Sequence, residues 1–203
     1  MGTTAGNQYT QYIQAKPVVT GSLKNNLIGN QIKPTERFDI VYVSQHAPFE
    51  IPNSEVKFFF GNKSITAEEF YAIEQKIVRF LAAHSKQTGQ SFAVLGKRTD
   101  SVSYEREFFV TAASPKEVQF IPRTSETSTY EFCNSASLIV TTDSTIGYEF
   151  LARGNRVVFL SGRINAVSDE LSREIHDTDF GFPLKLGSLG PFWTNTANES
   201  DFE

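Results

Sequence analysis

The chain has 203 residues, of which 39% are hydrophobic and 21% charged, and its formal net charge is −4. This composition is typical of a globular domain, and the net negative charge argues against a basic surface for nucleic acid. The single cysteine, Cys133, excludes an intramolecular disulfide and fits a reducing compartment, so we expect a cytoplasmic protein. No apolar run approaches the roughly 18 residues of a transmembrane helix, and the scattered histidines indicate no metal site.

The first part of the chain predicts an arm followed by a domain. Residues 1–16 are polar without a sustained period, so we expect a linker there and the domain over 17–203. Residues 21–26 are rich in turn formers and predict a loop. Residues 38–44 then predict a strand, which ends at Gln45 and His46.

A helix start follows at Thr66, because Thr66-Ala-Glu-Glu69 is a capping box. Apolar side chains at helical spacing continue this helix to about Ser85. The segments that follow predict a strand over 91–95, a helix over 103–112, a strand over 117–121 and a short helix over 127–135.

Residues 137–160 predict a strand, a polar turn, a helix and a second strand. After Ser161 the pattern weakens; 167–175 favours a helix, and 181–183 and 187–191 favour loops. The last residues, 200–203, resemble the first turn of a truncated helix. The strands lack alternation, as strands covered on both faces do. The order therefore predicts an α/β fold, with a doubly wound, mostly parallel sheet and helices on both faces.

The turn Asp143-Ser144-Thr145 is the strongest candidate site, because it lies between a strand end and a helix start. Phosphorylated ligands bind at such places, where free backbone N–H groups and the positive helix end point at the ligand. An ordinary N-cap explains the same residues equally well. Glu149 lies one turn further on, where it can accept hydrogen bonds from ribose hydroxyls or simply be a solvated acid. Gly147, costly inside a helix, suggests a close approach of ligand or backbone.

Other polar residues are expected at the same crevice. Gln45 and His46 end the first strand and are candidates to donate to phosphate, with a solvated loop as the alternative. Weaker candidates, equally explained as turn or surface residues, are Ser22, Lys24, Asn25, Asn26, Lys97 and Arg98.

The segment 137–160 resembles the donor-binding half of GT-B glycosyltransferases, and is most similar to bacterial surface-carbohydrate (O-antigen and capsule) biosynthesis proteins. Three other parts of the chain carry the resemblance: residues 18–26, residues 41–46, and the pair Gly181-Phe-Pro183 and Gly190-Pro-Phe-Trp193. The resemblance implies a single Rossmann-like half that binds a nucleotide-sugar as substrate, without cofactor or catalytic metal. It implies phosphate binding by Ser144 and Thr145 and ribose binding by Glu149.

GT-B enzymes have two such domains with the active site between them, and 203 residues have room for one. The resemblance therefore implies a chain that is inactive without an N-terminal domain or partner, with its catalytic residues elsewhere. Two alternatives on the same architecture remain open. One is half of a sugar-nucleotide epimerase or polyol-phosphate transferase, and the other is a non-catalytic interaction domain.

Overall fold

The computed structural model describes residues 23–28, 37–47, 49–60, 63–100, 102–113, 118–161 and 189–194. The chain divides into two compact units, residues 1–33 and 34–203, and each is described by itself. In the first unit, helix α2 (Leu23–Ile28) occupies part of the segment expected to be a loop, so that expectation is wrong. The expected arm, Ser22 and the expected helix over 167–175 lie outside the described residues.

The second unit alternates strands and helices. In chain order they are β1 (Ile40–Val43), β2 (Lys57–Phe60), β3 (Lys63–Thr66), α3 (Ala67–Thr88), β4 (Phe92–Leu95), α4 (Val102–Ala112), β5 (Gln119–Ile121), α5 (Ser128–Ser135), β6 (Leu138–Thr141), α6 (Thr145–Ala152), β7 (Val157–Leu160), β8 (Leu189–Gly190) and β9 (Trp193–Thr194). All strands and helices expected between residues 38 and 160 are confirmed, with small shifts at their ends. The β2–β3 hairpin was not expected, and β8 lies where a loop was expected.

The described strands of the main sheet follow the order β5-β4-β1-β6-β7-β9-β8. All neighbours pair in parallel except β8, which is antiparallel to β9. The chain thus starts at the centre with β1, builds outward through β4 to β5, and then crosses to β6 and β7 on the other side. This is the strand order of a doubly wound, Rossmann-like sheet, and it confirms the predicted fold class.

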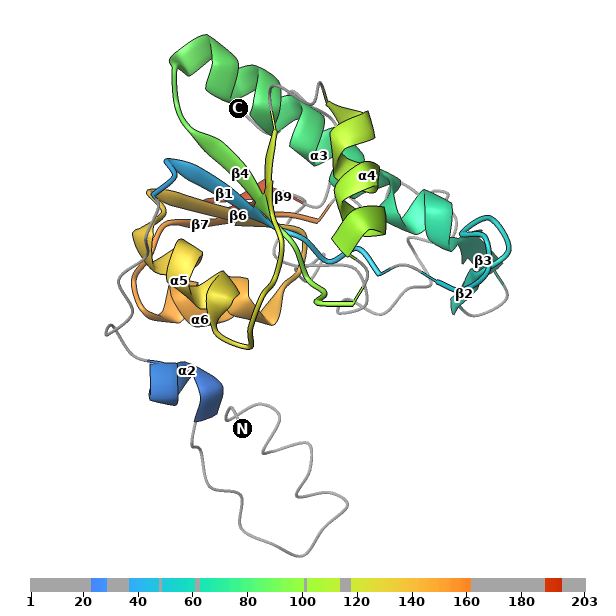
Figure 1. The fold of residues 1–203 in the computed structure, drawn as a ribbon, viewed down its shortest axis with the longest axis horizontal. Coiled ribbons are helices and arrows are strands. Elements are labelled where there is room, and N and C mark those ends of the chain that lie inside the picture. Colours follow the sequence, from blue (N-terminus) through green and yellow to red (C-terminus); the bar gives the residue numbers. More distant parts are fainter. Residues whose placement is uncertain are drawn as a thin grey trace, which may run out of the picture. The chain divides into compact units, whose positions relative to one another are not determined.

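Helices cover both faces of this sheet, with α3 and α4 on one face and α5 and α6 on the other (Figure 1). One face packs Tyr42 and Val94 against Ile77 of α3 and Phe109 of α4. Every residue of β1 and β4 is buried, as expected for parallel strands covered on both sides.

The capping box at the start of α3 is confirmed. The Thr66 hydroxyl accepts from the Glu69 N–H at 3.2 Å, and Glu69 Oε2 accepts from the Thr66 N–H at 2.7 Å. The helix ends at Gly89, whose φ of +70° is the left-handed conformation that glycine adopts most easily. No helix in the described ranges has the length and apolar character needed to cross a bilayer.

Candidate functional site

Strands β1, β4 and β6 are neighbours in the main sheet, and their carboxyl ends lie at the same level. Val43 of β1 pairs with Leu95 of β4 on one side and with Thr141 of β6 on the other. The strand order reverses between β1 and β6, so this edge is the topological switch point, where open α/β sheets bind their ligands.

A cavity of about 280 Å³ opens at this switch point. We call it the crevice, and the residues that line it are Val43, Ser44, Gln45, Gly96, Lys97, Arg123, Thr129, Asp143, Ser144, Thr145 and Ile146. The predicted site residues Gln45, Asp143, Ser144 and Thr145 are therefore brought together. Its volume is close to the lower end of the range for small-molecule sites.

The turn between β6 and α6 presents donors to the crevice. The Thr141 hydroxyl donates to the Val43 carbonyl and accepts from the Ser144 N–H, each over 3.2 Å, which fixes the turn. Ser144 is the N-cap residue, yet its hydroxyl makes no capping hydrogen bond. Thr145 and Ile146 open the helix, where N–H groups have no intrahelical acceptor. The first turn of α6 therefore brings N–H groups without an intrahelical acceptor to the crevice wall.

Two cations come to the crevice from the ends of β4 and β5. Lys97 Nζ donates to the Gln45 carbonyl over 3.2 Å, and Arg123 Nη1 donates to the Lys97 carbonyl over 3.2 Å. Arg98 instead makes a bidentate pair with Asp100, with contacts of 2.8 and 2.7 Å, and does not line the crevice. The sequence analysis missed Arg123. Its position just after the strand over 117–121 would have placed it at the same end of the sheet as Gln45 and Ser144.

Two buried glutamates lie beneath the loop that follows β1, and the sequence analysis missed both. Glu105 Oε1 accepts from the Ser44 hydroxyl at 2.5 Å and from the Lys97 N–H at 2.9 Å. Glu74 Oε2 accepts from the Gln45 N–H and from the Tyr42 hydroxyl, both at 2.9 Å. Helices α3 and α4 thereby fix the crevice wall formed by Ser44 and Gln45.

His46 does not line the crevice, because the structure buries it completely. Its ring stacks on Phe108 with centroids 3.8 Å apart and meets Tyr71 edge-on at 4.9 Å. Among the residues that the structure describes, neither ring nitrogen has a hydrogen-bond partner. Burial, assisted by the charge of Lys97, lowers the pKa of His46 to about 4. The ring is therefore neutral at physiological pH and faces aromatic side chains instead of a phosphate.

Glu149 is half-buried and lies outside the crevice lining. Its Oε2 accepts a hydrogen bond of 2.6 Å from the Tyr130 hydroxyl. Burial, with a further contribution from Glu149, raises the pKa of Tyr130, which therefore stays protonated as the donor. This contact joins α6 to α5. Thr129, which directly precedes Tyr130 in α5, lines the crevice.

Gly147 is explained by packing within the protein. A Cβ at this position would lie 2.7 Å from Thr141 Cγ2 and 3.0 Å from a ring carbon of Phe159. The glycine therefore lets α6 approach β6 and β7 closely. The close approach expected from the sequence is that of the sheet beneath the helix.

Asp143 adds a carboxylate to the crevice. Its Oδ1 accepts a hydrogen bond of 2.9 Å from the Tyr148 hydroxyl. Burial, followed by the charge of Asp143, raises the pKa of Tyr148, so the phenol remains the donor. This pair fixes an acceptor beside the donors of Ser144 and Thr145.

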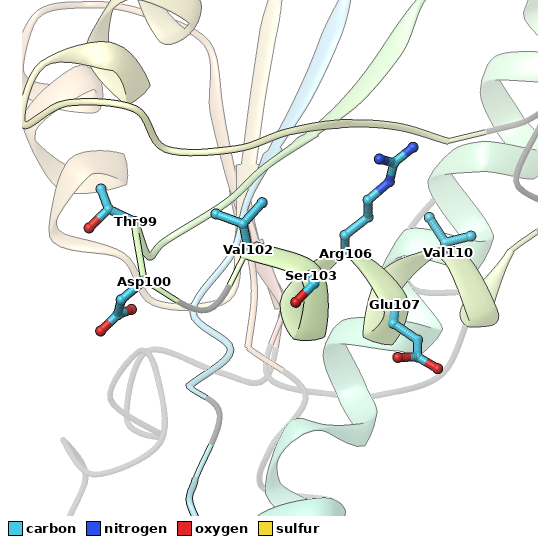
Figure 2. Close-up of a pocket in the computed structure, with 7 residues that line it drawn as sticks. All are labelled: Thr99, Asp100, Val102, Ser103, Arg106, Glu107 and Val110. Atoms are coloured by element: carbon cyan, nitrogen blue, oxygen red, sulfur yellow. The ribbon is translucent and has the colours of Figure 1, made fainter.

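A second, larger cavity of about 630 Å³ lies along the outer side of α4. Figure 2 shows its lining residues, from Thr99 and Asp100 in the loop before the helix to Val110 in its last turns.

Of the remaining sequence candidates, Lys24, Asn25 and Asn26 belong to α2 in the first unit. Within the described ranges, no group of three or more His, Cys, Asp or Glu residues gathers to hold a metal ion.

The strand order and the crevice together define a Rossmann-like domain with a polar site at its switch point. The sequence model of a protein family described as "putative O-antigen biosynthesis protein" matches residues 1–203. The chain belongs to this family, which supports the expected role in surface-carbohydrate biosynthesis. A search among curated proteins finds no match.

Proposed function

We propose that the crevice binds the phosphate of a sugar nucleotide, and that this domain is the donor-binding half of a glycosyltransferase in surface polysaccharide biosynthesis. The observation that carries the proposal is the gathering of hydroxyls, helix N–H groups and two cations at the switch point of a doubly wound sheet. Family membership supports a carbohydrate substrate.

Each group has a distinct part in binding. The N–H groups of Thr145 and Ile146, with the Ser144 hydroxyl, hold phosphate oxygens, and the helix dipole favours the negative charge. Lys97 and Arg123 neutralise the ligand from the opposite wall. Asp143 accepts from a sugar hydroxyl. Because the groups that perform the transfer belong to a second domain, we expect binding without turnover from this chain alone.

Thermal unfolding with CMP, CDP, UDP and GDP tests the proposal. A nucleotide at 100 times its Kd stabilises the folded state by about 2.7 kcal/mol, so at least one of the four should raise the Tm. Lys97→Ala should remove most of that rise. Arg98→Ala is the matched control, because the adjacent Arg98 pairs with Asp100 outside the crevice. An unchanged Tm with all four nucleotides would contradict the proposal and favour a non-catalytic interaction domain.

A further inference from the structure

We propose that the crevice is built for a single phosphate, so that the ligand is a nucleoside monophosphate joined to a sugar and not a diphosphate. The inference rests on the proposed function and names the substrate class of the same site. The observation behind it is that a carboxylate of the protein itself already occupies the backbone donors at the end of β4.

Glu105 is this internal anion. Its two carboxylate oxygens accept from the Lys97 N–H at 2.9 and 3.1 Å, and Oε2 lies 3.4 Å from the Arg98 N. In a doubly wound sheet, successive N–H groups after a strand are suited to hold phosphate oxygens. Here the turn after β4 directs these donors at Glu105 and therefore not at a ligand.

The surroundings of Glu105 are those of an ionised carboxylate. In every hydrogen bond described for Glu105, its carboxylate is the acceptor. The donors are the Ser44 hydroxyl and the backbone N–H groups of Lys97 and Arg98. The Ser44 oxygen also accepts from the His46 N–H at 3.1 Å, so the Ser44 hydrogen is directed at Glu105. Burial raises the pKa of Glu105, while these hydrogen bonds oppose that shift. The buried negative charge lies under the β4 side of the crevice.

The charges of the crevice leave no surplus of positive charge for a second phosphate. Asp143 among its lining residues and Glu105 beneath it offset the two cations, Lys97 and Arg123. Within the described residues, the turn at Ser144–Ile146 brings hydroxyl and helix N–H donors to the crevice on the side away from Glu105. A second phosphate on the β4 side would find the backbone N–H groups of Lys97 and Arg98 already donating to Glu105. The negative charge of Glu105 would also repel that phosphate.

Calorimetric titration of the 203-residue chain with CMP and CDP, UMP and UDP, and GMP and GDP tests this inference. For every base that binds, the monophosphate should bind at least as tightly as its diphosphate. A diphosphate that binds more tightly than its monophosphate would overturn the inference and leave nucleotide binding intact. Absence of binding by all six would instead overturn the proposed function, so the two failures are distinguishable.

Glu105→Gln tests the role of the internal anion. Loss of the charge should lower the Kd of the diphosphate relative to that of the monophosphate by threefold or more. A ratio unchanged from the wild type would contradict the role given to Glu105. Because the buried substitution can impair folding, the wild-type comparison of each nucleotide pair tests the inference independently.

Discussion

The Tyr130 hydroxyl donates a hydrogen bond of 2.6 Å to Glu149 Oε2, and this contact fastens α5 to α6 beside the crevice. Glu149 therefore has a structural partner as well as its predicted role toward ribose. Its second oxygen, Oε1, receives no hydrogen bond described in the structure and can still accept from a ligand hydroxyl.

Comparison of Tyr130→Phe with Glu149→Ala separates these two roles. If Glu149 acts through Tyr130 alone, both variants should weaken nucleotide binding to the same extent. If Oε1 binds ribose, Glu149→Ala should weaken binding by about 1.5–3 kcal/mol more than Tyr130→Phe does, since it removes a hydrogen bond to a charged acceptor. Calorimetric Kd values of the wild type, both single variants and the double variant measure the difference. Equal losses would contradict ribose binding by Glu149.

Gly147→Ala should destabilise the fold even though alanine favours a helix. The added methyl group would crowd Thr141 Cγ2 and the Phe159 ring, and overpacking of this kind costs roughly 1–3 kcal/mol. Denaturant unfolding measures the loss. Thr141→Ser is the matched background, because it removes Cγ2 and keeps the hydroxyl that bonds Val43 and Ser144. Gly147→Ala should cost less there, and an equal cost would rule out this packing contact as the cause.

The burial of His46 should make the folded state sensitive to acid. Its pKa falls from the ordinary 6.5 to about 4 on folding, so the unfolded chain binds the proton first. The contribution of neutral His46 to the free energy of unfolding is therefore fully present above pH 6.5. It is lost as the pH falls toward 4, by about 3 kcal/mol in total. The free energy of unfolding between pH 7 and about 4, from urea titrations, measures this loss.

His46→Phe removes the titrating group and keeps an aromatic ring in the stack with Phe108. The variant should show a shallower decline of unfolding free energy with acid than the wild type. The raised pKa of Glu105 acts in the opposite direction, but it is present in both proteins and cancels in the comparison. His84, an exposed histidine on α3, is the control position. Parallel pH profiles for wild type and His46→Phe would contradict this assignment.

The fold was predictable because its signals are local. The buried strands read as unbroken apolar runs, and Thr66 with Glu69 marked the start of α3. The β2–β3 hairpin was missed because Lys57–Phe60 and Lys63–Thr66 are short, and the second runs directly into that helix. The helix α2 was missed because the asparagines of Leu23–Ile28 favour turns.

The lining of the crevice was predictable where it follows strand ends, as at Gln45 and Ser144. It was not predictable where the decisive partner is distant in sequence. Ser44 and Glu105 are 61 residues apart, and an acid on a predicted helix is most simply solvated. Likewise, the sequence around His46 indicates a loop residue. Its burial against α3 and α4 depends on tertiary packing, which the local sequence does not show.

Amide chemical shifts of the 15N-labelled chain, followed during titration with CMP, UMP and GMP in turn, test the central claim most directly. Binding at the switch point should move the amides of Thr145, Ile146 and Lys97 most, because they lie at the two walls of the crevice. If none of the three nucleotides moves these amides, or if the largest shifts fall on Thr99–Val110 along the cavity of Figure 2, the crevice is not the nucleotide site.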